Sequence, residues 1–217
     1  MRFVPLICNV ESMCLILFAY RHHCRYPLII AANRDEYYER PSVPAAFWND
    51  FPDILAGRDL RAGGTWLGIT KSGRIAAVTN FRDPRSHKEH APSRGRLLTD
   101  YLCGDEKPGE FIESILPTAK RYNGFSIILG DLFHLYCFSN VNGFMRDIAP
   151  GIHGLSNHLI DTPWPKVKRG KEMLGTLLSR EEHPSAEAIF DILADTTLPD
   201  DFLLPDTGVG LERARVL

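Results

Sequence analysis

A cysteine that follows a methionine near the start of the chain is the residue best suited to chemistry. Cys14 comes directly after Met13 and opens an apolar run, 15–18. A chain that began at Cys14 would carry a thiol and a free α-amine on one residue. Ordinary pKa values of about 8.5 for a thiol and about 8 for an α-amine let the amine take the thiol proton near neutral pH. Nucleophile and base would then share one residue, as in N-terminal nucleophile hydrolases, which suits acyl transfer through a thioester.

Residues 1–12 must be absent for this chemistry. The segment 3–8 looks superficially like a secretion signal, but its apolar run is short, Pro5 interrupts it and no small-residue cleavage site follows. A start codon assigned too early or a pro-segment removed after folding would expose Cys14, whereas a plain N-terminal extension would block it. We expect residues 1–12 to be an extension or a misassigned start, followed by one domain over 13–217.

Composition excludes several classes of protein. The 217 residues are 44% hydrophobic and 24% charged with a net charge of −2, which fits one globular domain and offers no basic footprint for nucleic acid. No window is apolar enough to span a membrane.

Five cysteines without a metal-type spacing predict reduced thiols and a cytoplasmic protein. We expect Cys24, Cys103 and Cys137 to be small buried hydrophobes, and we expect no metal or other cofactor. Nothing in the pattern predicts an oligomeric state.

The elements that must position Cys14 can be predicted from periodicity and turn residues. Strand pairs joined by short turns favour antiparallel sheets, and the grouping of strands and helices favours two sheets with helices outside. Two prolines, Pro41 and Pro44, predict an extended, irregular stretch. The predicted strands are 15–20, 28–32, 65–69, 74–79, 125–129, 132–138 and 151–157, and the predicted helices are 93–103, 108–120, 165–178 and 185–194.

Four polar residues lie at or just beyond the ends of these strands, as Cys14 does: Arg34, Asp35, Asn80 and Asn157. Arg34 near the α-amine would lower the amine pKa by like-charge repulsion, and Asp35 could orient the amine. The amide groups of Asn80 and Asn157 could donate to an oxyanion. Each residue also has a structural interpretation: Cys14 as core, the Arg34–Asp35 pair as a capping or salt-bridge turn, and the asparagines as turn residues.

Several short strings along the chain match one family. They are Met13-Cys14, Leu28-Ile29-Ile30-Ala31-Ala32-Asn33-Arg34-Asp35-Glu36 with Arg40-Pro41, Gly63-Gly64-Thr65-Trp66-Leu67-Gly68, Val78-Thr79-Asn80-Phe81, Arg94-Gly95, Tyr122-Asn123-Gly124-Phe125, Gly154-Leu155-Ser156-Asn157 and Asp161-Thr162-Pro163-Trp164-Pro165-Lys166. In this order they closely resemble the NRDE family, also called the transport and Golgi organisation protein 2 family. Members of that family begin at the equivalent of Met13.

The resemblance implies an α+β fold, a four-layer αββα sandwich of the N-terminal nucleophile hydrolase type with two mainly antiparallel sheets. It also implies distant kinship with choloylglycine hydrolases and penicillin V acylases, whose catalytic roles carry over to Cys14, Arg34, Asp35, Asn80 and Asn157. Asp35 fits least well, because those acylases leave a wider gap between arginine and aspartate. Relatives continue into closing strands with a Gly-Thr-Arg segment that this chain lacks, so we expect a chain truncated at its C-terminus.

Two functions follow from these features. The first is an amidohydrolase or acyltransferase that acts on a small amide-bonded substrate through a Cys14 thioester. The second, which the resemblance suggests, is a non-catalytic binding or trafficking protein for haem or a lipid-like ligand on the same scaffold, although the chain has no Cys-Pro haem motif. The expected partner is a small amide or a hydrophobic ligand, with neither nucleic acid nor a membrane span.

Overall fold

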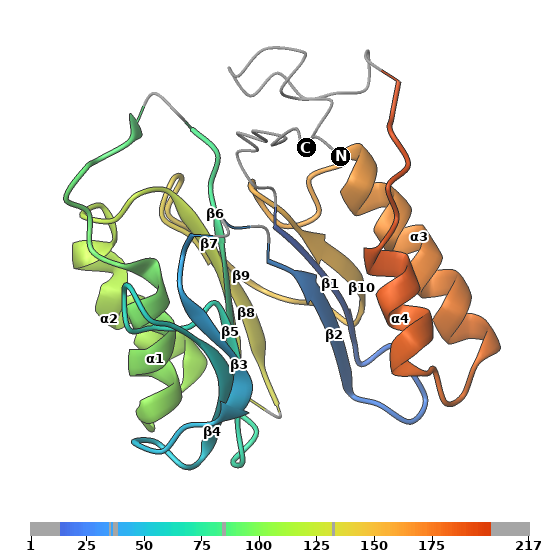
Figure 1. Ribbon diagram of the computed structural model, residues 1–217, viewed down its shortest axis with the longest axis horizontal. Helices are drawn as coiled ribbons and strands as arrows, with labels where there is room; N and C mark the ends of the chain where they lie inside the picture. Colours follow the sequence, from blue (N-terminus) through green and yellow to red (C-terminus); the bar gives the residue numbers. More distant parts are fainter. Residues whose placement is uncertain (1–13, 35, 37–38, 84–85, 132, 201–217) are drawn as a thin grey trace, which may run out of the picture.

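The computed structural model describes residues 14–34, 36, 39–83, 86–131 and 133–200. They form four layers, in which two helices cover the outer face of each of two stacked sheets (Figure 1). Every strand pairing in both sheets is antiparallel. The predicted α+β class and the αββα sandwich are therefore confirmed.

The smaller sheet has three strands in the order β10-β1-β2. Its central strand, β1 (Leu15–Tyr20), is buried along its whole length, as a strand covered on both faces should be. The flanking strands are β2 (Leu28–Asn33) and β10 (Gly151–Leu155). These strands match three of the predicted strands closely.

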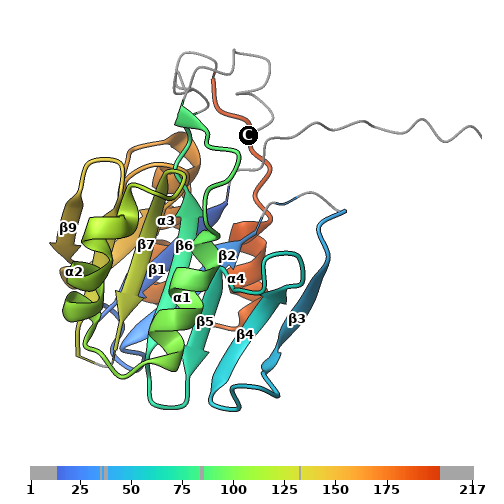
Figure 2. The ribbon, with the colours of Figure 1, turned by 90° about the vertical axis from the view of Figure 1, so that its left-hand side faces the viewer.

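The larger sheet has seven strands in the order β3-β4-β5-β6-β7-β8-β9, so each strand pairs with its neighbours in sequence. Figure 2 shows this sheet with α1 and α2 in front of it. Its strands are β3 (Ser42–Phe47), β4 (Ile54–Asp59), β5 (Leu67–Thr70), β6 (Ile75–Asn80), β7 (Phe125–Gly130), β8 (Leu135–Ser139) and β9 (Phe144–Asp147).

Strands β3, β4 and β9 were not predicted from the sequence. The stretch around Pro44 is a strand rather than irregular chain. Proline is tolerated there because β3 lies at the sheet edge, where one side of the strand needs no hydrogen-bond donors, and its pairing with β4 shifts register between Val43 and Ala46. The β9 strand is only four residues long and mostly exposed, so it has little apolar periodicity to detect.

The helices confirm the sequence prediction to within two residues at each end. They are α1 (Arg94–Cys103) and α2 (Pro108–Ala119) on the larger sheet, and α3 (Pro165–Arg180) and α4 (Ala186–Leu193) on the smaller one (Figure 1). Ser185 caps α4 by accepting a hydrogen bond from Ala188 N–H. Within the described residues, no helix combines the length and apolarity needed to cross a membrane.

Three apolar clusters fill the spaces between the four layers. One lies between α1–α2 and the larger sheet, one between the two sheets, and one between the smaller sheet and α3–α4. Strand β1 divides its residues by alternation: Ile16 and Phe18 belong to the inter-sheet cluster, whereas Leu15 and Leu17 belong to the cluster under α3 and α4. This alternation decides which way the residue that precedes β1 faces.

Two cysteines contradict the sequence-based expectation. Cys24 and Cys103 are exposed, and only Cys137 is buried as expected. Cys24 lies in the polar turn between β1 and β2, and Cys103 is the last residue of α1, so neither faces a core. Both thiols are open to reagents.

Candidate active site

Strand pairing, continued past its last recorded pairs, predicts that Cys14 lies between two of the predicted site residues. Leu15 pairs with Asn33, so one further step along the same register puts Cys14 opposite Arg34. On the other side of β1, Ile16 pairs with Leu155, and continuing that register puts Cys14 opposite Asn157. Paired residues of antiparallel strands have Cα atoms about 4.5–5.5 Å apart. The start of β1 therefore gathers Cys14, Arg34 and Asn157 at one end of the smaller sheet.

The alternation of the three strands, continued past their ends, predicts that the same three residues face the larger sheet. Side chains alternate along a strand, and each of the three lies an even number of positions from residues of the inter-sheet cluster. The cluster residues that establish this parity are Ile16 and Phe18 on β1, Ile30 and Ala32 on β2, and Leu155 on β10.

Asn157 connects the two sheets. Its buried side chain donates from Nδ2 to the main-chain carbonyl of Asn80, at 3.0 Å, and its own carbonyl accepts from Arg82 N–H at 2.8 Å. An amide group carries two N–H donors, so the contact with Asn80 leaves one for a bound oxygen atom. Asn157 is thus held in place by two contacts with the end of β6 and the residues after it.

Ser156 is a polar neighbour of Cys14 that sequence reasoning gave no role. Its hydroxyl donates to the carbonyl of Cys14 at 2.8 Å, while its own carbonyl accepts from the Thr79 hydroxyl at 2.7 Å. Both Ser156 and Thr79 are almost completely buried. Ser156 therefore links the backbone of Cys14, in the smaller sheet, to Thr79 of the larger sheet.

Asn80 contributes its backbone to this arrangement. It is the last residue of β6, and its carbonyl accepts from Asn157. Its side chain is exposed and makes no hydrogen bond to any described residue. The alternation of β6 puts Thr79 on the inter-sheet face and Asn80 on the opposite face. The oxyanion role of the Asn80 side chain stays a prediction, and Asp35 lies outside the described residues.

Arg34 is fixed by an aromatic ring and a carboxylate. Its guanidinium carbon lies 4.4 Å from the centre of the Trp66 ring, and its Nη2 lies 3.5 Å from Glu36 Oε2. Glu36 also lies 3.7 Å from Arg40, which makes its closest ion pair, of 2.6 Å, with Asp59. These two contacts give Arg34 a defined position.

Arg94 is a second arginine near this end of the sheets, and sequence reasoning did not assign it a role. Its Nη1 donates to the carbonyl of Gly124 at 3.0 Å, and the same carbonyl accepts from Phe81 N–H at 2.9 Å. Burial lowers the pKa of Arg94, and the like charge of Arg40 lowers it further, whereas Glu36 and Cys14 act in the opposite direction. The signal in the sequence was the Arg94-Gly95 pair, one of the strings shared with the family.

The first turn of α1, which carries Arg94, packs tightly against the segment before β5. A Cβ atom on Gly64 would collide with the backbone of Gly95, and Thr65 N–H donates to the Gly95 carbonyl at 3.3 Å. Trp66, the residue that stacks on Arg34, follows directly. The two glycines thus let the chain that holds Arg94 approach the chain that holds Trp66.

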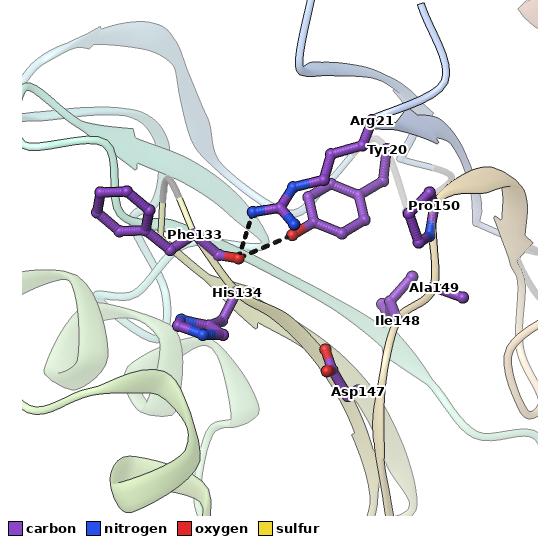
Figure 3. Close-up of a pocket in the computed structure, with 8 residues that line it drawn as sticks. All are labelled: Tyr20, Arg21, Phe133, His134, Asp147, Ile148, Ala149 and Pro150. Carbon is purple, nitrogen blue, oxygen red and sulfur yellow. Dashed lines mark hydrogen bonds between the residues drawn. The ribbon is translucent and has the colours of Figure 1, made fainter.

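The cavity in Figure 3 lies elsewhere. It opens at the far end of β1, where Tyr20 Oη and Arg21 Nη2 both donate to the carbonyl of Phe133, at 3.1 and 2.7 Å. None of the predicted site residues lines it. In the described part of the chain, no group of three histidine, cysteine or acidic side chains is arranged to hold a metal ion.

Comparison with known proteins identifies the family. The family model described as Transport and Golgi organisation 2 matches residues 13–216. The mouse Transport and Golgi organization 2 homolog is 35% identical over 210 residues, which cover 91% of this chain and 76% of the mouse protein. The chain belongs to the Transport and Golgi organisation 2 family. The Drosophila melanogaster protein of that family is 28% identical over 94% of the chain and 82% of its own length.

Two solved structures were also found to be similar to this member of the Transport and Golgi organisation 2 family. One is a Caenorhabditis elegans ortholog of N-acylethanolamine-hydrolyzing acid amidase, 11% identical with a TM-score of 0.41, covering 90% of this chain and 95% of that one. The other is penicillin V acylase from Agrobacterium tumefaciens, 11% identical with a TM-score of 0.38, covering 89% of this chain and 67% of that one.

Proposed function

We propose that the chain is a cysteine amidohydrolase or acyltransferase whose nucleophile is Cys14 and whose substrate is a small amide. The supporting observation is the register of the smaller sheet, whose continuation past Leu15–Asn33 and Ile16–Leu155 predicts that Cys14 lies between Arg34 and Asn157. The proposal requires a mature chain that begins at Cys14, because only then is the α-amine free to act as a base.

The residues of the site then have separate roles. The α-amine takes the thiol proton, and the thiolate forms a bond to the substrate carbonyl carbon. The remaining N–H donor of Asn157 stabilises the negative oxygen, a contribution of about 2.7–4 kcal/mol for one such donor. The C–N bond breaks as the ammonium returns its proton to the leaving amine. Water, or a second amine, then cleaves the thioester and frees Cys14.

The test compares the full chain with a chain begun at Met13, each expressed with Cys14 and with Cys14→Ser. Intact mass shows whether the mature chain begins at Cys14. We expect a thiol-directed probe to modify Cys14 faster than Cys24 and Cys103, which are both exposed and serve as internal references. A chain that starts at Cys14 yet labels no faster there than at Cys24 would refute the proposed nucleophile.

The names of the relatives favour a second function. The mouse and Drosophila proteins are both named for transport and Golgi organization, which supports a ligand carrier on this scaffold. On that proposal the chain binds haem or a lipid-like molecule without turnover. A haem titration that leaves the spectrum of free haem unchanged, together with no retention of fatty acyl ligands, would exclude the carrier function.

A further inference from the structure

Arg94 is a half-buried cation with no ion pair among the described residues, and it lies near enough to Cys14 to feel the charge of its thiolate. Of the arginines near Cys14, Arg34 pairs with Glu36 and Arg40 pairs with Asp59. Arg94 has no carboxylate within ion-pair distance in the part of the chain that the structure describes, and its one hydrogen bond goes to the neutral carbonyl of Gly124. A guanidinium carries five N–H donors, so most of those on Arg94 have no partner among the residues that the structure describes.

The position of Arg94 follows from backbone contacts on two sides. Its guanidinium shares the Gly124 carbonyl with Phe81 N–H, and Phe81 directly follows Asn80, whose carbonyl binds Asn157. On the other side, the first turn of α1 packs on the glycine-rich segment that leads to Trp66. The Gly124 contact thereby fixes the guanidinium beside the end of β6, and the glycine contact fixes the start of α1 beside the chain that leads to Trp66.

We propose that Arg94 binds a carboxylate on the substrate, so that the amide cleaved at Cys14 belongs to an acidic molecule such as an N-acyl amino acid. This inference rests on the proposed function of Cys14. Partial burial without a counter-ion disfavours a cation, and a bound carboxylate would remove that penalty through two charge-assisted hydrogen bonds. One unpaired guanidinium matches the single charge of a carboxylate better than the charge of about −2 on a phosphate monoester.

Iodoacetate and iodoacetamide test the inference, because they differ only in a carboxylate and an amide. In the chain that starts at Cys14, we expect the ratio of iodoacetate to iodoacetamide rates at Cys14 to exceed the ratio at Cys24 by about 10- to 100-fold, the range of a hydrogen bond to a charged group. Arg94→Gln keeps a donor for Gly124 but removes the charge, and should abolish the excess. Arg96→Gln, an exposed arginine on the same helix, should leave the ratio unchanged.

The outcomes separate the two proposals. Equal ratios at Cys14 and Cys24, or a ratio that Arg94→Gln leaves unchanged, would overturn the carboxylate site even if Cys14 reacts rapidly with iodoacetamide. If Cys14 proves unreactive, the hydrolase proposal fails, and calorimetry then decides on the site. N-octanoylglycine should bind at least about 10-fold more tightly than N-octanoylglycinamide, and only when Arg94 is present. Absence of that preference, or tighter binding of octyl phosphate, would refute the inference.

Discussion

Asp161 fastens the segment that follows Asn157 to the smaller sheet, and we predict that Asp161→Asn lowers the free energy of unfolding by about 2 kcal/mol at pH 7. Its Oδ2 lies 2.7 Å from His153 Nδ1, and its Oδ1 accepts from Lys171 Nζ at 2.6 Å and from Gly154 N–H at 3.1 Å. Asp161 has a left-handed backbone, with φ of 57°. Asparagine tolerates that conformation, so the substitution removes charge without adding backbone strain.

The magnitude comes from the titration of Asp161. Burial alone would raise its pKa, but the hydrogen bonds from His153, Lys171 and Gly154 outweigh burial and lower the pKa from 3.8 to about 2. Each pKa unit is worth about 1.36 kcal/mol, which gives roughly 2 kcal/mol. Because the folded-state pKa is depressed, this stabilisation is complete above the unfolded-state value of 3.8 and is lost as the pH falls towards about 2.

Urea unfolding at a series of pH values checks both the size and the sign. The wild type and Asp161→Asn should differ by about 2 kcal/mol from pH 7 to pH 5 and converge between about pH 4 and pH 2. Asp53→Asn is the matched control, since Asp53 makes an exposed ion pair with Lys71, and it should change stability by no more than about 0.5 kcal/mol. A stability difference that persists unchanged at pH 2.5, or no difference at pH 7, would refute the reasoning.

Three further predictions concern buried residues. Thr79→Val keeps the shape of the side chain but leaves the Ser156 carbonyl without its buried donor, so urea unfolding should show a loss of about 1–3 kcal/mol; an unchanged midpoint would contradict this. Gly57→Ala places a Cβ about 2.5 Å from the Trp66 ring. We expect this collision to lower the free energy of unfolding by about 1–3 kcal/mol and to alter tryptophan fluorescence. A fluorescence spectrum identical to that of the wild type would contradict the close packing of Gly57 on Trp66. Burial raises the pKa of Cys137 to about 12, so iodoacetamide at pH 8 should modify this thiol only in denaturant. Peptide mapping that finds Cys137 modified in the folded protein would contradict its burial.

The sequence carries enough information to predict most of the smaller sheet and all four helices. The apolar run of β1 and the Ser185 cap of α4 are local signals, and local signals are what periodicity and capping rules detect. Strands β3, β4 and β9 escaped because their pairing depends on neighbours in the sheet. Strand β4, for example, contains Gly57. A Cβ atom at this position would lie 2.5 Å from the Trp66 ring, which belongs to another segment of the chain.

The candidate site could be predicted only in part. Strand ends identify Cys14, Arg34 and Asn157, because antiparallel pairing brings ends together. Arg94 belongs to a helix on the other sheet, and its relation to the site depends on the shared Gly124 carbonyl, a contact between segments 30 residues apart. No local pattern encodes such a contact, so only the shared Arg94-Gly95 string pointed towards it.

The hydrophobic pattern of β1 determines the direction of Cys14 as well as the fold. Leu15 and Leu17 must pack under α3 and α4, and Ile16 and Phe18 must pack against the larger sheet. A slip of one residue would exchange these two sets and turn Cys14 towards the outer helices. Because such a slip would misplace every apolar side chain of a fully buried strand, the packing that stabilises the sandwich also holds the proposed nucleophile on the face where Asn157 and the end of β6 lie.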